Sequence, residues 1–237
     1  MKLSADIIII GSGASGGVLA ATLAERTGKK IILLEKGGYY EGASIVQEEL
    51  GVRHLFSERG TRGTKDGSIP IRGGQCIGGG TTVNVALCFD PLESVWKKWK
   101  SEFGIEEYSF NSNDNDYDIN GLNMANALKD VRKRINVHEV PDNMVNDNNR
   151  LFKEGCQSEG VSFKKFELNI KNCIECGFCA VGCKYDRKMG TMITYVADAI
   201  QNGVEVIHNF DVEKIIFSGS KNNKKATGIQ GKIREAN

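Results

Sequence analysis

The sequence lacks an excess of charge of either sign, and it lacks a long apolar run. It carries 31 Lys plus Arg against 30 Asp plus Glu, a net charge of +1. This balance argues against a protein held to nucleic acid by phosphate contacts, and against an acidic solvating tail. The uncharged stretch 7–24 contains glycines and serines where a signal peptide or a membrane helix is continuously apolar, so we expect neither.

Length and cysteine content set further limits. The 237 residues fit one large domain or two small ones at roughly 150 residues per domain. Without a secretory signal we expect a cytoplasmic protein, in which the seven cysteines are not a disulfide framework. The 28 glycines are about 12% of the 237 residues, above the average share of about 7%. This excess indicates segments that need a permissive backbone.

The first forty residues predict a strand, a helix and a second strand. Ile7–Ile10 is a short β-branched run typical of a strand buried on both faces. A helix then begins after the glycines and stops near Gly28, and Ile31–Leu34 forms the next strand. This βαβ order predicts an α/β fold with a Rossmann-like parallel sheet.

Three glycines between the first strand and the helix form a dinucleotide fingerprint. The first makes a tight turn, the second lets backbone approach a pyrophosphate, and the third lets helix and strand pack closely. An acid at the end of the second strand can accept from a ribose hydroxyl and repels a 2′-phosphate, which favours FAD or NAD over NADP. The candidate cofactor residues here are Gly11, Gly13, Ser15, Gly16 and Glu35.

This turn has two other interpretations. One is a tight glycine turn without a ligand. The other is a hydrolase nucleophile elbow, because residues 13–17 also match G-x-S-x-G. The elbow requires an acid and then a histidine downstream, and none of His54, His138 and His208 lies in a recognisable motif. We therefore reject the hydrolase interpretation.

A second glycine-rich segment, IPIRGGQCIGGGTTVNVALCFDP at 69–91, points to a family. Together with the fingerprint and the acid followed by glycines, it resembles the glucose-methanol-choline (GMC) oxidoreductases. The resemblance implies FAD as the cofactor and a segment that wraps the flavin diphosphate and the isoalloxazine edge. The residues that it assigns to this role are Arg72, Gly73, Gly78, Gly79, Gly80, Thr81 and Asn84.

The chain departs from the family pattern at one position and matches it again further along the sequence. Many members carry an arginine six residues after the asparagine, where this chain has Asp90. The resemblance resumes at Lys188–Thr191, which leads into a helical stripe ended by Gly203 and then into two strands. In the family this region returns to the FAD domain, and the resemblance implies a backbone contact from Val212 to adenine. We predict an FAD-binding part at 1–108, a linker with a partial helical substrate domain at 109–170 and a cysteine-rich loop at 171–190. Residues 191–237 are predicted to return to the FAD-binding domain.

The polar run 111–118 predicts a loop or a boundary. Asp116, Asp118 and Asn120 match the first half of a calcium-binding loop, but the position of the bidentate glutamate is Ala127. A solvated turn is the favoured interpretation.

Four cysteines, Cys173, Cys176, Cys179 and Cys183, fall within one short segment. Their spacing lets a loop present several thiolates to an iron-sulfur cluster, as in bacterial ferredoxins. The proline that usually follows the last cysteine is absent. Zinc and a thiol or disulfide redox loop stay open as alternatives. The resemblance adds that long-chain alcohol oxidases and related flavin dehydrogenases carry a cysteine-rich insert at this place.

The resemblance implies oxidation of a CH–OH group of an alcohol, sugar or sterol, with hydride passing to the flavin. In the family a histidine of the C-terminal half takes the alcohol proton, and that position is absent, so we name no catalytic residue. We expect the fold to be incomplete relative to the full family fold and a C-terminal half or partner chain to supply the histidine. The alternatives are a non-catalytic electron-transfer subunit and a truncated fragment without activity alone.

Overall fold

The computed structural model describes residues 2–48, 52–104, 124–220 and 223–234, and it divides the chain into two compact units. Unit 1 comprises residues 1–86 and 172–237, and unit 2 comprises residues 87–171. The predicted boundary at 108 and the polar run with Asp116 and Asp118 lie outside the described residues.

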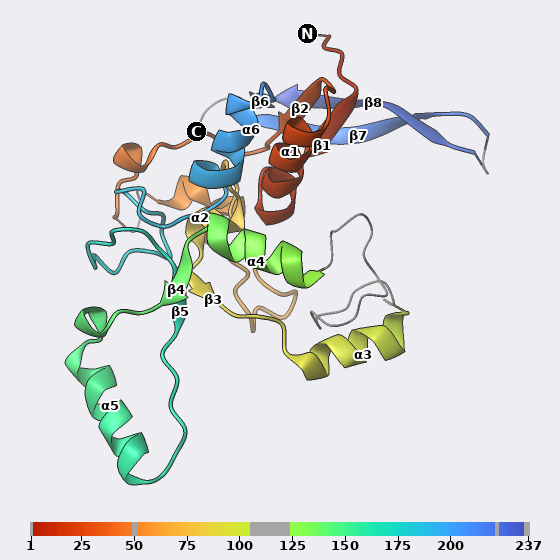
Figure 1. The fold of residues 1–237 in the computed structure, drawn as a ribbon. Coiled ribbons are helices and arrows are strands. Elements are labelled where there is room, and N and C mark those ends of the chain that lie inside the picture. Colours follow the sequence, from red (N-terminus) through yellow and green to blue (C-terminus); the bar gives the residue numbers. More distant parts are fainter. Residues whose placement is uncertain (1, 49–51, 105–123, 221–222, 235–237) are drawn as a thin grey trace. The chain divides into compact units, whose positions relative to one another are not determined.

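Unit 1 is built on a three-stranded parallel sheet in the order β1-β2-β6. Helix α1 connects β1 to β2 and, in Figure 1, lies beside α6. The expectation of an α/β fold with a parallel sheet is confirmed. The elements of unit 1 are β1 (Ile7–Ile10), α1 (Ala14–Arg26), β2 (Ile31–Leu34), α2 (Gly80–Val83), a π-helical turn (Met192–Val196), α6 (Ala197–Gln201), β6 (Glu205–Ile207), β7 (Phe210–Ser218) and β8 (Lys225–Ile233), with 3-10 turns at Gly42–Ser44, Arg53–Leu55 and Ser57–Gly60.

The core of the sheet forms around β2. All four residues of β2 are buried, because β1 and β6 flank it on both sides. Alanines on α1 and apolar residues before and within α6 cover it. The buried members of this cluster are Ile9, Ala20, Ala21, Ile31, Leu33, Ile77, Val196, Ala199 and Val204.

The prediction that β1 is buried on both faces is wrong. Ile9 is 6% exposed, but Ile8 and Ile10 are 37% and 50% exposed. In the described part of the chain β1 pairs only with β2, so it is an edge strand. Its side chains alternate between the two faces of the sheet, so Ile9 faces the core while Ile8 and Ile10 lie on the opposite face, which is open to solvent at this edge.

The helical stripe predicted after Thr191 begins as a π-helical turn. Val196 N donates to Thr191 O at 2.8 Å, a five-residue step, before α6 begins. Gly203, at φ +85°, follows α6 as the sequence predicts. Figure 1 shows β7 and β8 as a long two-stranded antiparallel ribbon.

Unit 2 contains an antiparallel sheet in the order β3-β5-β4, which the sequence did not predict. Arg132 bridges this region, since it pairs with Asp90 at 2.8 Å and with Glu167 at 2.6 Å. Asp90, the departure from the family pattern, therefore has a local partner. The elements are β3 (Leu87–Cys88), α3 (Glu93–Phe103), α4 (Met124–Arg134), β4 (Val137–Glu139), α5 (Asp147–Ser158) and β5 (Glu167–Asn169), with a 3-10 turn at Asp142–Met144. Among the residues that the structure describes in either unit, no helix is long and apolar enough to cross a bilayer.

Because β2 is the central strand, Leu33→Ala should lower the free energy of unfolding by about 2 to 5 kcal/mol through lost burial and a residual cavity. Urea unfolding followed by circular dichroism measures this. The matched control is Leu19→Ala on α1, where the side chain is 49% exposed and the expected change is within about 0.5 kcal/mol. Equal losses for both variants would contradict this assignment of the core.

Candidate cofactor site

The turn between β1 and α1 has the geometry that the glycine fingerprint requires. Gly11 adopts φ +93° and donates its N–H to Leu34 O at 2.7 Å. A Cβ on Gly16 would lie 1.8 Å from Gly11 O, so only glycine allows this approach of helix and strand. A Cβ on Gly13 would meet nothing within 4 Å. The turn is therefore tight where it packs on the strand and open at Gly13.

The N-terminus of α1 is open to an anion. Its N-cap, Gly13, provides no side-chain hydrogen bond, and its first turn contains no acidic residue. The first N–H groups of a helix have no partner within the helix and carry a partial positive charge. Ser15 is exposed in this first turn. The arrangement can accept a phosphate without displacing a cap.

Glu35 is buried at the end of β2 and holds the glycine turn. It is 6% exposed. Its Oε2 accepts from Ser12 N at 3.0 Å and from Ser12 Oγ at 2.7 Å, and its Oε1 accepts from Gly37 N at 2.8 Å. The carboxylate thus has a structural role within the chain that the sequence did not indicate, and the ribose contact stays a prediction.

Ser12 joins the first glycine segment to the second. Its Oγ, which donates to Glu35, also accepts from Gly78 N at 3.1 Å. A Cβ on Gly79, at φ +50°, would lie 3.1 Å from Gly13 Cα. The structure therefore brings together two predicted segments that are distant in sequence.

The rest of the second segment packs on a separate small core. Apolar residues around Cys76 and Val83 anchor it, namely Ile45, Val52, Leu55 and Phe56. Burial raises the pKa of the Cys76 thiol to about 12, so it is an inert core thiol. Along this segment the predicted residues Arg72, Gly80 and Asn84 are exposed, whereas Gly73 and Thr81 are half-buried.

Thr191 ties both glycine segments together from a third part of the chain. Its Oγ1 lies 2.9 Å from Thr81 Oγ1, and its N–H donates to the same Thr81 oxygen at 3.0 Å. The Thr191 hydroxyl also lies 3.2 Å from Ser12 O. The return segment thus closes the site from the side of α6.

Val212 lies in β7 near the end of β2. Phe210 N donates to Glu35 O at 2.9 Å, and Lys36 Nζ lies 3.2 Å from Asp211 Oδ2. These contacts bring the start of β7 to the end of β2 that holds Glu35. The adenine contact of Val212 stays a prediction.

Lys188 connects this site to residues 173–183, the part of the predicted loop 171–190 that holds the four cysteines and that is hereafter the cysteine-rich loop. Its side chain is buried, and Nζ donates to Thr82 O at 2.8 Å, to Asn84 O at 2.7 Å and to Cys179 O at 2.6 Å. Burial lowers the pKa of Lys188 to about 8, against the opposing effect of the nearby cysteines. Neither Lys188 nor Ser12 was a predicted site residue, although Lys188 stands in the K-x-G-T segment that carries the resemblance.

The four cysteines of the loop are free thiols of intermediate exposure. Glu175 N donates to Cys173 Sγ at 3.4 Å, and Arg187 N donates to Cys183 Sγ at 3.2 Å. Burial, and then the negative charge of the neighbouring thiolates, raises the pKa of Cys179, while Lys188 opposes the shift. In the described part of the chain, no three Cys, His, Asp or Glu side chains form a group that could hold a metal ion. The metal site at these cysteines stays a prediction from spacing.

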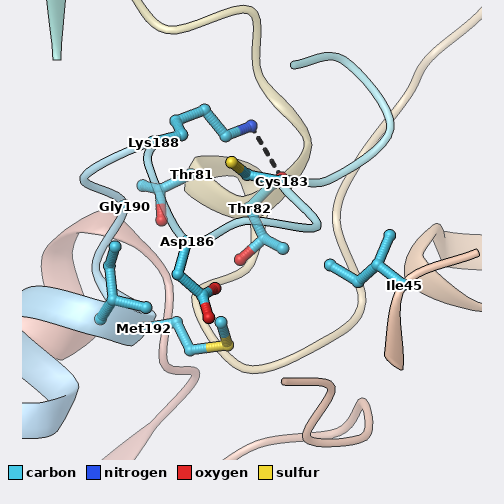
Figure 2. A pocket seen from close by; sticks show the side chains of 9 residues that line it. Ile45, Thr81, Thr82, Cys183, Asp186, Lys188, Gly190 and Met192 are labelled. Carbon is cyan, nitrogen blue, oxygen red and sulfur yellow. Dashed lines mark hydrogen bonds between the residues drawn. The ribbon is translucent and has the colours of Figure 1, made fainter. Parts of the chain in front are cut away.

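A small cavity of about 20 Å³ lies between the second glycine segment, Ile45 and residues 183–193. Figure 2 shows its side chains, with a dashed line for the hydrogen bond of Lys188 to Thr82. The residues that line it are Ile45, Thr81, Thr82, Cys183, Asp186, Lys188, Gly190, Met192 and Ile193.

Comparison with known proteins decides the family. The GMC oxidoreductase family model matches residues 6–237. The chain belongs to the GMC oxidoreductase family. The family supports FAD as the cofactor, in agreement with the open turn at Gly13. The resemblance deduced from the two glycine segments is thereby confirmed.

Curated GMC relatives match nearly the whole chain. The chain is 27% identical to the long-chain-alcohol oxidase FAO3 of Arabidopsis thaliana, over 100% of this chain and 31% of that protein. It is 29% identical to an uncharacterised GMC-type oxidoreductase of Mycobacterium tuberculosis, over 92% of this chain and 33% of that protein. The chain thus spans about a third of the length of these relatives.

Solved structures show the same fold. Pyridoxine 4-oxidase from Mesorbium loti superposes with a TM-score of 0.61 at 16% identity, over 98% of this chain and 47% of that one. A formate oxidase superposes with a TM-score of 0.58 at 13% identity, over 96% and 42% of the two chains. The α/β architecture of this part of the GMC fold is therefore present in the chain.

Because its hydroxyl joins Glu35 to Gly78, Ser12→Ala should lower the free energy of unfolding by about 1 to 3 kcal/mol, the cost of leaving buried polar groups without partners. Urea unfolding of the flavin-free chain measures the change. Ser15→Ala, at an exposed serine of the same turn, should leave stability within about 0.5 kcal/mol of the parent. A Ser12→Ala chain as stable as Ser15→Ala would show that the buried network does not stabilise the fold.

Proposed function

We propose that the chain binds FAD through its two glycine segments, as part of a flavin-dependent oxidoreductase that oxidises CH–OH groups. The observation that carries the proposal is the meeting of the uncapped N-terminus of α1 with Gly79 of the second segment beside the open position at Gly13. Backbone N–H groups and an absence of side chains at one place suit a diphosphate.

The proposed contacts follow the order of the cofactor. Gly11, Gly13, Ser15 and Gly16 would hold the diphosphate at the start of α1, and the free lone pairs of Glu35 would accept from the adenosine ribose. Val212 would contact adenine through its backbone. The residues proposed along the diphosphate and the flavin edge are Arg72, Gly73, Gly78, Gly79, Gly80, Thr81 and Asn84.

The proposed reaction is oxidation of an alcohol, with the bound flavin as the hydride acceptor. The names of the long-chain-alcohol oxidases support an alcohol as the small-molecule substrate. We assign the described residues to binding and orienting the cofactor. The group that takes the alcohol proton is proposed to lie in a C-terminal half or a partner chain, and none of the three histidines of this chain is given that role.

An anaerobic flavin-reduction assay tests the reaction. The chain is loaded with FAD, and loss of the oxidised flavin absorbance is followed with long-chain and short-chain alcohols, alone and with the remaining part of a GMC relative as a separate chain. Reduction that requires this second chain is expected. Bound flavin that no alcohol reduces in either mixture would contradict the enzyme and favour an electron-transfer subunit.

Gly13→Val should abolish FAD binding while leaving the fold intact. The side chain would occupy the open space where the diphosphate is proposed to approach, and it meets no atom of the chain within 4 Å at the Cβ position. Fluorescence titration of the flavin-free chain measures affinity, and circular dichroism measures folding. Gly28→Val is the matched control, because Gly28 has equal open space and lies outside the proposed site. Retained FAD affinity in Gly13→Val would overturn the fingerprint assignment.

An iron-sulfur cluster that relays electrons from FAD is a separate proposal, which rests on the cysteine spacing. Anaerobic purification should then yield iron and acid-labile sulfide with the chain, and Cys176→Ser should lower both. Cys156→Ser, outside the loop, is the control and should change neither. Zinc without sulfide, or no metal, would rule out the cluster while leaving FAD binding untouched.

We also propose a cytoplasmic location. Cys76, Cys156 and the four cysteines of the loop are free thiols, as cysteines stay in a reducing compartment. Fractionation of cells that express the complete protein tests this, and secretion with oxidised cysteines would contradict it.

A further inference from the structure

Lys188 is the polar link between the cysteine-rich loop and the second glycine segment. It has three donors, and each is used on a backbone carbonyl: Cys179 O on the loop, and Thr82 O and Asn84 O at the end of α2. The residue is 5% exposed. An ammonium group is therefore solvated inside the protein by carbonyls from two segments about 100 residues apart.

This arrangement makes the two segments depend on each other. A buried cation is costly unless all its donors have partners, and here the partners are neutral carbonyls. If the loop moves away, the Cys179 carbonyl is lost to the cation. If the end of α2 changes its conformation, two acceptors are lost together. The charge is stable only when loop and segment hold their positions at the same time.

Beside this link the packing contains a small cavity and an apolar anchor. Thr81, Thr82, Cys183 and Lys188 line the cavity of about 20 Å³ (Figure 2). The loop also has an apolar anchor, since Val181 packs against the small core and a Cβ on Gly182 would lie 2.9 Å from Ile45 Cδ1. Loss of the lysine should therefore loosen the link and leave the loop attached.

We propose that Lys188 is a positioning residue that couples the cysteine-rich loop to the FAD-binding segment Gly78–Asn84. The proposal rests on the proposed function, because it assumes that this segment binds FAD. FAD that orders the segment also holds the Cys179 carbonyl in place and protects the loop. By linkage, a chemical change of the loop that breaks the contact weakens FAD binding.

The test compares Lys188→Met with Lys184→Met, an exposed lysine of the same region. The first readout is FAD affinity of the flavin-free chain. The second is the rate at which iodoacetamide alkylates Cys179 of the metal-free chain, measured by mass spectrometry with and without saturating FAD, with Cys156 as the reference thiol. In the parent and in Lys184→Met, FAD should slow alkylation of Cys179 about tenfold. In Lys188→Met, FAD affinity should fall about tenfold and the protection should disappear.

The protection ratio distinguishes coupling from a purely structural role. A lysine that only stabilises the fold would change the melting temperature and the affinity but leave the ratio unchanged, and that outcome would overturn the proposal. If Lys188→Met does not fold, the parent protein provides the test, because prior alkylation of its loop should weaken FAD binding. An FAD affinity unchanged by alkylation of the loop would overturn the coupling. A parent chain that binds no FAD would contradict the proposed function instead.

Discussion

The buried carboxylate of Glu35 is the interaction on which the candidate site depends. It ends β2, accepts both donors of Ser12, and accepts the N–H of Gly37. A carboxylate with three donors in a dry environment is held by strong, directional hydrogen bonds. Since Ser12 in turn accepts from Gly78, one acid fixes the relative positions of the first turn, the end of the second strand and the second glycine segment.

The same arrangement explains why glycine is so frequent in this part of the chain. Three backbones converge where Ser12, Gly37 and Gly78 meet, and side chains would keep them apart. A Cβ on Gly37 would lie 2.0 Å from Gln75 O, and a Cβ on Gly74 would lie 2.2 Å from Gly79 O. Some glycines therefore serve contacts within the protein, while the space beside Gly13 stays open.

Sequence patterns predicted the parts of the structure that obey local rules. The βαβ unit was found from apolar runs, and the roles of Gly11 and Gly16 were found from the geometry of a tight turn. The partners of Ser12 and Lys188 could not be predicted, because they depend on carbonyls and N–H groups of distant segments. Short strands such as β4 and β5 were not predicted, because three residues are too few to show the alternation of a strand. The exposure of Ile8 and Ile10 was not predicted, because a local sequence pattern does not determine the order of the strands in the sheet.

The π-helical turn at Met192–Val196 sets the rotation of the helix between two sets of contacts, those of Thr191 and those of the sheet core. Thr191 must direct its hydroxyl toward Ser12 and Thr81, while Val196 and Ala199 must point into the sheet core. A π turn closes a hydrogen bond over five residues where an α turn closes it over four, and the additional residue rotates the rest of the helix by about 100°. The orientation of Thr191 is thus set separately from the orientation of Val196 and Ala199. Substitutions that repack the core around α6 therefore leave the Thr191 hydroxyl directed toward Ser12 and Thr81.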